Sequence, residues 1–138
     1  MTDIYTNADC TVYNKSLDKK LRADVWHRTV IKGVYWEDTV GQKLNKNLLN
    51  ECNAFVIIPC NADFGGKRYV KPKSYDGSED TFTFAADDII VRGICDKNIS
   101  QDFTLKQLHS LDDVRTIMSA DDFRYGSENV KHMEVTAK

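Results

Sequence analysis

Few residues in this 138-residue chain have the types and spacing that could support chemistry. Gly65-Gly66-Lys67-Arg68 has the composition of a phosphate-binding loop, because glycines let backbone N–H groups approach an anion that a lysine can then reach. A P-loop requires G-x-x-x-x-G-K-[ST], however, whereas here Arg68 occupies the Ser/Thr position and the earlier glycine is missing. The pattern therefore favours a flexible turn over a nucleotide site.

Carboxylates occur as adjacent pairs that could bind calcium or act as acid and base: Asp87-Asp88, Asp112-Asp113 and Asp121-Asp122. Neighbouring residues of an extended chain point to opposite sides, and the sequence has no D-x-D-x-D-G series to surround a cation. We therefore expect solvated turn residues. The three histidines are far apart in sequence and lack a G-x-S-x-G or Cys–His signature. We predict no catalytic, metal or cofactor site, and a protein that is not an enzyme.

The cysteines and aromatic residues are expected to pack. The four cysteines, at positions 10, 52, 60 and 95, form no C-x-x-C pair, so a zinc site is not expected. Cys10, Cys60 and Cys95 lie in or at the end of apolar runs, which predicts buried thiols in a reducing compartment. The positive charges nearest to Tyr13, Trp26, Tyr35, Trp36 and Phe55 are Arg22, Arg28 and Lys32, which are expected to lie on the surface or to pair with acids. The aromatic residues are therefore expected to pack in the core or at a protein interface and not to form a platform for bases.

Composition indicates one globular domain over residues 1–138. Hydrophobic residues make up 41% and charged residues 29%, and the net charge of −2 provides no basic excess for holding nucleic acid. The longest apolar run, Ala54 to Cys60, is far too short to cross a membrane, and the N-terminus lacks the features of a signal peptide. We therefore expect no membrane association and a cytoplasmic origin.

Alternation of apolar and polar residues predicts a mainly β fold. Strands are expected at 10–14, 24–31 with 34–36, and 130–136, and Gly33 is expected to mark a bulge or bend. Two runs, 53–60 and 88–95, are apolar on both faces and are predicted to be central or covered strands.

Helical signals are few. Thr104 and Gln107 have the spacing of a capping box, which predicts one short helix. The segment Gln42–Glu51 is compatible with a helix or a loop.

The segment 61–80 differs from its surroundings. It carries three glycines and many charged residues between two apolar runs, which predicts a long, exposed, mobile inserted loop. Loops of this length inside a compact domain are usually functional or disordered. Its centre, Phe64, Gly65, Gly66, Lys67, Arg68 and Tyr69, is our candidate assembly loop.

Several short segments carry a resemblance to a known family: Thr11-Val12-Tyr13-Asn14, Gly33-Val34-Tyr35-Trp36-Glu37, Asp88-Ile89-Ile90-Val91-Arg92-Gly93, Leu111-Asp112-Asp113-Val114 and the stretch from Tyr125 to Lys138. Over nearly the whole chain, this order resembles a family of small structural proteins that tailed phages and prophages encode among their head–tail assembly genes. Its members look like the small β-barrel head-closure proteins, or stoppers, which seal the portal channel and join the capsid to the tail. Adaptor proteins of the same connector are mainly helical, so the strand-rich pattern favours a stopper or a tail-completion protein over an adaptor.

The resemblance implies a small β-barrel with one short helix and a long inserted loop. It implies a virion protein at the head–tail junction, made in the host cytoplasm, that assembles without a cofactor into a ring, which we expect to be six-fold. Its partners would be the portal or adaptor protein and the tail-completion or tail-tube protein, with DNA present only as channel contents. Trp36, His132 and Glu134 are the candidate interface residues. The alternatives are a tail-completion or minor capsid protein, or a small-ligand- or carbohydrate-binding β-domain.

Overall fold

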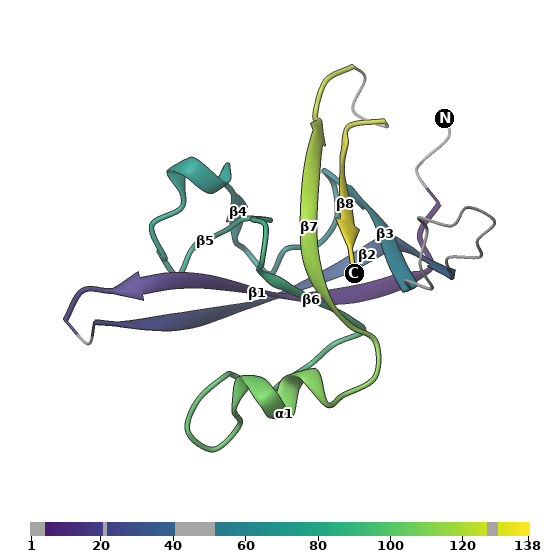
Figure 1. Ribbon diagram of the computed structural model, residues 1–138. Helices are drawn as coiled ribbons and strands as arrows, with labels where there is room; N and C mark the ends of the chain where they lie inside the picture. Colours follow the sequence, from purple (N-terminus) through teal and green to yellow (C-terminus); the bar gives the residue numbers. More distant parts are fainter. Residues whose placement is uncertain (1–4, 21, 41–51, 127–129) are drawn as a thin grey trace, which may run out of the picture.

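The computed structural model describes residues 5–20, 22–40, 52–126 and 130–138 (Figure 1). Its elements in chain order are β1 (Ala8–Asp18), β2 (Ala23–Val40), β3 (Cys52–Pro59), β4 (Arg68–Tyr69), the 3₁₀ turn η1 (Pro72–Ser74), β5 (Thr81–Phe82), β6 (Ile89–Arg92), α1 (Leu105–His109), β7 (Val114–Phe123) and β8 (His132–Ala137). The prediction of a mainly β chain with one short helix is confirmed for these residues. The possible helix at 42–51 lies outside them.

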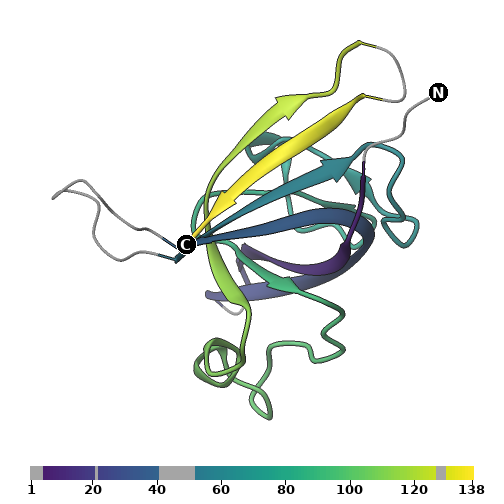
Figure 2. The ribbon, with the colours of Figure 1, turned by 90° about the vertical axis from the view of Figure 1, so that its right-hand side faces the viewer.

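Six strands form one sheet in the order β1-β2-β3-β8-β7-β6, and all of its pairings are antiparallel. β6 also pairs with β1, through the residues Cys10–Tyr13 of β1, so each of the six strands has a hydrogen-bonded neighbour on both edges. Figure 2 shows β2, β3 and β8 side by side on one flank of this sheet. β4 and β5 form a separate parallel pair.

β2 bends at Gly33, as predicted. The β1–β2 register places Ala8 opposite Val34 and Asp9 opposite Lys32, so Gly33 is left out of the ladder as a bulge. Its φ of 89° is in the region that glycine adopts without steric cost, and its N–H donates to the Asp9 carboxylate at 3.0 Å.

The main core is formed by alternate residues of the sheet, including Val12, Ile31, Val56, Ile58, Ile90, Ile117 and Val135. A second cluster joins Tyr13, Ile89 and Val91 to Leu108 of α1. The predicted covered strand 88–95 is confirmed for Ile89 to Val91, which are buried on both faces because the helix covers the outer face of β6. The strand ends at Arg92, and Ile94 beyond it is 56% exposed.

β3 departs from the same prediction. Val56 and Ile58 are buried, but Phe55 and Ile57 are only half-buried, so the outer face of β3 remains partly open. The apolar run could not distinguish a covered outer face from an open one.

The helix begins as its sequence predicts. The Thr104 hydroxyl accepts from the Gln107 backbone N–H, and the Gln107 side chain accepts from the Thr104 N–H at 2.8 Å. Leu108 is fully buried and anchors the helix to the second cluster. No helix in the described part of the chain is long and apolar enough to cross a membrane.

The interpretation of 61–80 as an exposed excursion is wrong for three of its residues. The Phe64 ring lies 5.1 Å from that of Phe82, and the Tyr69 ring stacks on Phe84 at 5.6 Å. Lys67 Nζ donates to the Arg28 carbonyl oxygen at 2.8 Å. The many glycines and charged residues of this segment suggest exposure, but Phe64 and Tyr69 pack against the core. Burying an aromatic side chain is favourable enough to hold the segment there despite its polar neighbours.

The cysteine prediction is confirmed for one of three positions. Cys10 is buried and has no thiol partner, and burial together with the Asp9 charge raises the pKa of its thiol well above the usual range. Cys60 and Cys95 are only half-buried. Cys95 instead accepts a hydrogen bond from the Tyr13 hydroxyl at 3.0 Å, so its environment is partly polar.

Candidate functional site

The most prominent feature of the surface is a hairpin that extends beyond the six-stranded sheet, at the left of Figure 1. β1 pairs with β6 only through Cys10–Tyr13, and β2 pairs with β3 only from Tyr35 onward. Beyond Tyr13, where β1 no longer pairs with β6, β1 and β2 stay paired to each other as far as Asp18 and Ala23. We call residues 15–20 and 22–26 the arm.

A buried polar network fixes the base of the arm. Asp88 is 3% exposed and accepts from Asn14 Nδ2 at 2.8 Å and from the Lys15 N–H at 3.2 Å. Asn14, also buried, donates through Nδ2 to the Thr83 carbonyl at 2.6 Å and accepts from the Thr83 N–H at 3.2 Å. These bonds join β1 to the segment between β5 and β6.

The expectation that Asp88 is a solvated turn residue is therefore wrong. Three donors converge on its carboxylate, two from the adjacent residues Asn14 and Lys15 of β1 and the third from the Ala85 N–H at 3.4 Å. Burial raises the pKa of Asp88, and the hydrogen bonds from Asn14, Lys15 and Ala85 offset only part of this effect. Asp87, its neighbour, is exposed as expected.

A polar pocket of about 410 Å³ lies between the arm and the segment that follows η1. Lys15 and Lys19 line it on the arm side, and Tyr75, Asp76 and Asp88 line it on the other. The Tyr75 hydroxyl oxygen is enclosed and has no hydrogen-bond partner within the described residues. Burial, together with the nearby Asp88 and Asp76 charges, raises the pKa of Tyr75 to about 12, so the phenol stays neutral as a potential donor.

A serine and a histidine meet beside this pocket. Ser16 Oγ lies 2.7 Å from His27 Nε2, and the His27 ring packs edge-on against Tyr75 at 6.3 Å. Burial and the Lys67 charge lower the pKa of His27, which favours the neutral imidazole. Among the described residues no carboxylate hydrogen-bonds to Nδ1 of His27, so the third member of a nucleophilic triad is missing. The contact between Ser16 and His27 joins the side chains of β1 and β2 near the base of the arm.

The residues of the candidate assembly loop divide into two groups. Phe64, Lys67 and Tyr69 pack inward, whereas Gly65, Gly66 and Arg68 are exposed. Gly65 and Gly66 have φ values of 66° and 84°, which accounts for two successive glycines in this tight turn. Gly65-Gly66-Lys67-Arg68 thus forms the predicted turn.

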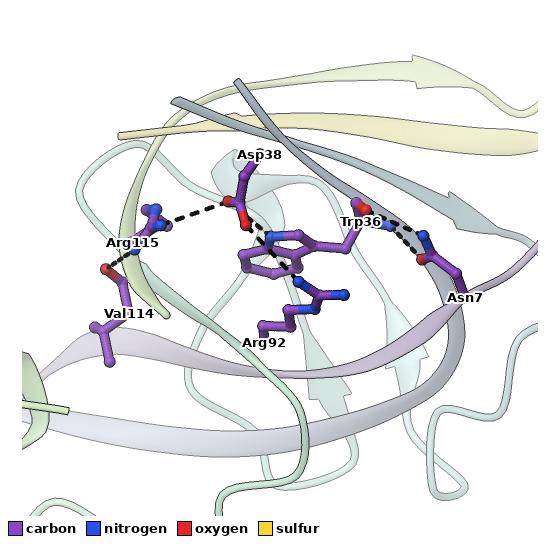
Figure 3. Close-up of polar contacts among 6 residues, drawn as sticks. All are labelled: Asn7, Trp36, Asp38, Arg92, Val114 and Arg115. Carbon is purple, nitrogen blue, oxygen red and sulfur yellow. Dashed lines mark hydrogen bonds and ion pairs between the residues drawn. The ribbon is translucent and has the colours of Figure 1, made fainter. Parts of the chain in front are cut away.

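The choice of Trp36 as an interface residue is wrong. Its side chain is 3% exposed and belongs to the main core. Its indole Nε1–H donates to the Asp38 carboxylate at 3.0 Å, while the Asn7 side chain bonds the Trp36 backbone N–H and carbonyl oxygen (Figure 3). The same carboxylate lies 3.8 Å from Arg92 and 3.5 Å from Arg115. Because its polar group has an intramolecular partner, the indole can be buried.

His132 and Glu134, the other interface candidates, lie on the outer face of β8. They are half-buried, and their side chains meet at 2.9 Å. Burial lowers the pKa of His132, but the hydrogen bonds to the Val130 carbonyl and to Glu134 outweigh it, so the net shift is upward. The Phe123 ring stacks on His132 at 5.3 Å.

The end of β7 links this pair to the candidate loop. Arg124 lies 4.9 Å above the Tyr69 ring and forms a 2.8 Å ion pair with Asp122. Tyr125, the next residue, is 67% exposed. Tyrosine and arginine are enriched in protein interfaces, so this end of the molecule has the composition of a contact surface.

Residues 5–138 match the sequence model of a protein family whose function is unknown. The chain belongs to the DUF6751 family. No curated protein and no solved structure matches it significantly. What this DUF6751 protein does must therefore be argued from its own residues.

The sequence does not reveal the arm or its buried anchor. The strands predicted at 10–14 and 24–31 give no sign that β1 extends to Asp18 and pairs there with Ala23. The predicted covered strand 88–95 includes Asp88, but its polar partner could not be predicted, because Asn14 lies 74 residues away. In the described part of this DUF6751 protein, no group of three or more His, Cys, Asp or Glu side chains could hold a metal ion.

Proposed function

We propose that this protein is a structural component of a phage head–tail connector, a head-closure protein that assembles into a ring between the portal or adaptor and the tail. The observation that carries the proposal is the arm, an exposed two-stranded extension of an otherwise self-paired sheet. A subunit of this shape suits assembly with neighbours better than it suits catalysis.

The physical argument rests on unpaired strand edges. In the six-stranded body every strand has two neighbours, an order that supports the small β-barrel implied by the resemblance. Beyond the body, the two strands of the arm pair only with each other. An isolated two-stranded hairpin is marginally stable, and free strand edges are templates for another chain. The arm is therefore expected to gain stability when a neighbouring subunit docks on it.

The proposed assembly is a homo-oligomeric ring, expected to be six-fold, that contacts the portal or adaptor on one side and the tail-completion or tail-tube protein on the other. The exposed part of the candidate loop, Gly65, Gly66 and Arg68, and the surface around His132 and Glu134 are the proposed contacts beyond the ring. DNA would be present only as the contents of the channel.

The decisive experiment is cryo-electron microscopy of the intact particle, together with mass spectrometry of purified virions. The proposal predicts density for this fold at the head–tail junction. Finding the chain on the capsid surface would favour a minor capsid role, and finding it at the tail end of the junction would favour tail completion. Absence of the chain from virions would overturn all three.

A second candidate function, the binding of a small polyhydroxylated ligand, is favoured by the pocket beside the arm. Its enclosed Tyr75 hydroxyl and buried Asp88 carboxylate would pair with a ligand that both donates and accepts hydrogen bonds. Thermal melting with a panel of mono- and disaccharides would test it. A sugar that stabilises the wild type but not Tyr75→Phe would support the candidate, and a panel without effect would remove it.

A further inference from the structure

We infer that the arm of one copy of this protein docks on an acidic face of a second copy, beside the turn between α1 and β7. This inference rests on the proposed function, because it specifies how the subunits of the ring would join. The acidic face is formed by the exposed residues Ile94, Asp96, Leu111, Asp112 and Asp113.

The arm offers positive charge and an exposed apolar side chain. It carries four basic residues, Lys15, Lys19, Lys20 and Arg22, and two acidic ones, Asp18 and Asp24. Leu17 is 64% exposed on the same hairpin. Within the described residues, no ion pair involves any of the four basic side chains. Lys15 Nζ lies 5.9 Å from the centre of the Trp26 ring, so the charges available to another molecule are those of Lys19, Lys20 and Arg22.

The acidic face offers the complement. Ile94 is 56% exposed and Leu111 is 43% exposed, and three aspartates lie within two residues of them in the sequence. Of the two exposed basic residues nearby, Arg92 pairs with Asp38 and Lys97 is the one that offsets part of the negative charge. The Arg92 N–H donates to the Asp113 carbonyl at 3.1 Å, which holds the end of β6 beside the start of β7. Ile94 and Leu111 each lie two residues from this contact, so the two apolar side chains belong to one local surface.

The two surfaces are arranged for a head-to-tail contact. Figure 1 shows the tip of the arm at the far left of the molecule and the turn between α1 and β7 below the sheet, right of the centre, so the two surfaces are separate. A contact between two different surfaces is heterologous, and repeating it closes a ring when the rotation between copies allows. Opposite charge on the two surfaces would also disfavour arm-to-arm pairing.

Other surface features give weaker evidence for a binding surface. The Ser16–His27 contact lacks an orienting group, and the end of β7 offers no charge imbalance that selects a partner. The arm and the acidic face are complementary in both charge and apolar contact, so a second copy of the chain is the occupant that the structure favours.

The test uses two variants of the full chain, and each variant alters the charge of one of the two surfaces. Lys19→Glu/Lys20→Glu reverses the charge of the arm. Asp112→Lys/Asp113→Asn alters the acidic face, with asparagine chosen because Asp113 has a φ of 60° and asparagine tolerates that conformation. Sedimentation velocity at increasing protein concentration measures self-association, and circular dichroism checks that each variant is folded.

The wild type is expected to self-associate, and each variant to do so at least about tenfold more weakly, because close interfacial charge pairs contribute strongly to affinity. A 1:1 mixture of the two variants should form a heterodimer and nothing larger, since one intact arm then meets one intact face. The matched control Lys71→Glu/Lys73→Glu, which makes the same charge change at two exposed lysines outside the arm, should behave as the wild type.

A monomeric wild type, variants that associate as the wild type does, or a mixture that does not dimerise would each overturn the inference. These outcomes are independent of the virion experiment above. If the protein is found at the head–tail junction but its self-association does not depend on these charges, the proposed function stands and the proposed contact is refuted.

Discussion

Removing the Asp88 carboxylate should destabilise the fold strongly, although it lies in a sequence typical of a turn. Asp88→Ala leaves the Asn14 side-chain N–H and the Lys15 backbone N–H without the acceptor that they now have at 2.8 and 3.2 Å. Each buried donor left unsatisfied costs about 1–3 kcal/mol. Relief of the carboxylate's own burial cost, which raises its pKa, offsets part of this loss.

The net expectation is a loss of about 3 kcal/mol, a large share of the roughly 5–15 kcal/mol that stabilises a domain of this size. Urea unfolding at neutral pH, followed by the fluorescence of Trp26 and Trp36, measures it. Asp121→Ala, which removes an exposed aspartate from β7, is the matched control and should change stability by no more than about 0.5 kcal/mol. An equally small loss in Asp88→Ala would refute the assignment of a buried anchor.

The pH dependence provides a second test of the same carboxylate. The pKa of Asp88 is raised in the folded state, so between the unfolded and folded pKa values the folded protein binds more protons than the unfolded one. The stability that this group contributes is therefore fully present below its unfolded pKa and is lost as pH rises through its folded pKa. The stability of wild type relative to Asp88→Asn should fall as pH rises above about 4, the ordinary pKa of an aspartate, and through the raised folded pKa of Asp88. An opposite slope would mean that the hydrogen bonds outweigh burial.

Three further predictions concern other parts of the fold. Gly77→Ala should lower the melting temperature more than Gly93→Ala, because both glycines have positive φ but only at Gly77 would the new Cβ lie 2.8 Å from a serine hydroxyl of the arm; equal shifts would rule out that clash. NMR titration should show a pKa for His132 above its ordinary value, with the stability it contributes lost as pH rises through that pKa, and Glu134→Gln should lower the pKa. If Glu134→Gln left the pKa of His132 unchanged, the contact between these two side chains would be refuted. Val91→Asp should prevent folding, since an unpaired buried charge costs several kcal/mol; a normal melting curve would exclude Val91 from the core.

The features that the sequence predicts well are local ones. The bulge at Gly33, the capping box of Thr104 and Gln107, and the alternation in β8 each depend on residues within a few positions of one another. Local preferences and tertiary contacts agree at these places, so the pattern and the structure coincide.

The features that it predicts poorly depend on distant partners. Trp36 was assigned to an interface, but Asn7 and Asp38 satisfy its polar groups and allow it to be buried. The glycines of 61–80 suggested exposure, but Phe64 and Tyr69 find an aromatic cluster that includes residues beyond the segment. The extent of the arm could not be predicted either, because a strand pattern does not reveal where a third strand stops pairing.

The continuity of β1 and β2 from the sheet into the arm has a mechanical consequence. The two strands keep one register from Asp9 opposite Lys32 to Asp18 opposite Ala23, so the arm has no hinge at its base. A pull along the arm loads in shear the ladders that join β1 to β6 and β2 to β3, and several hydrogen bonds must then yield together. A sideways force would instead peel those bonds one at a time. The arm should behave as a stiff lever along its axis and a compliant one across it.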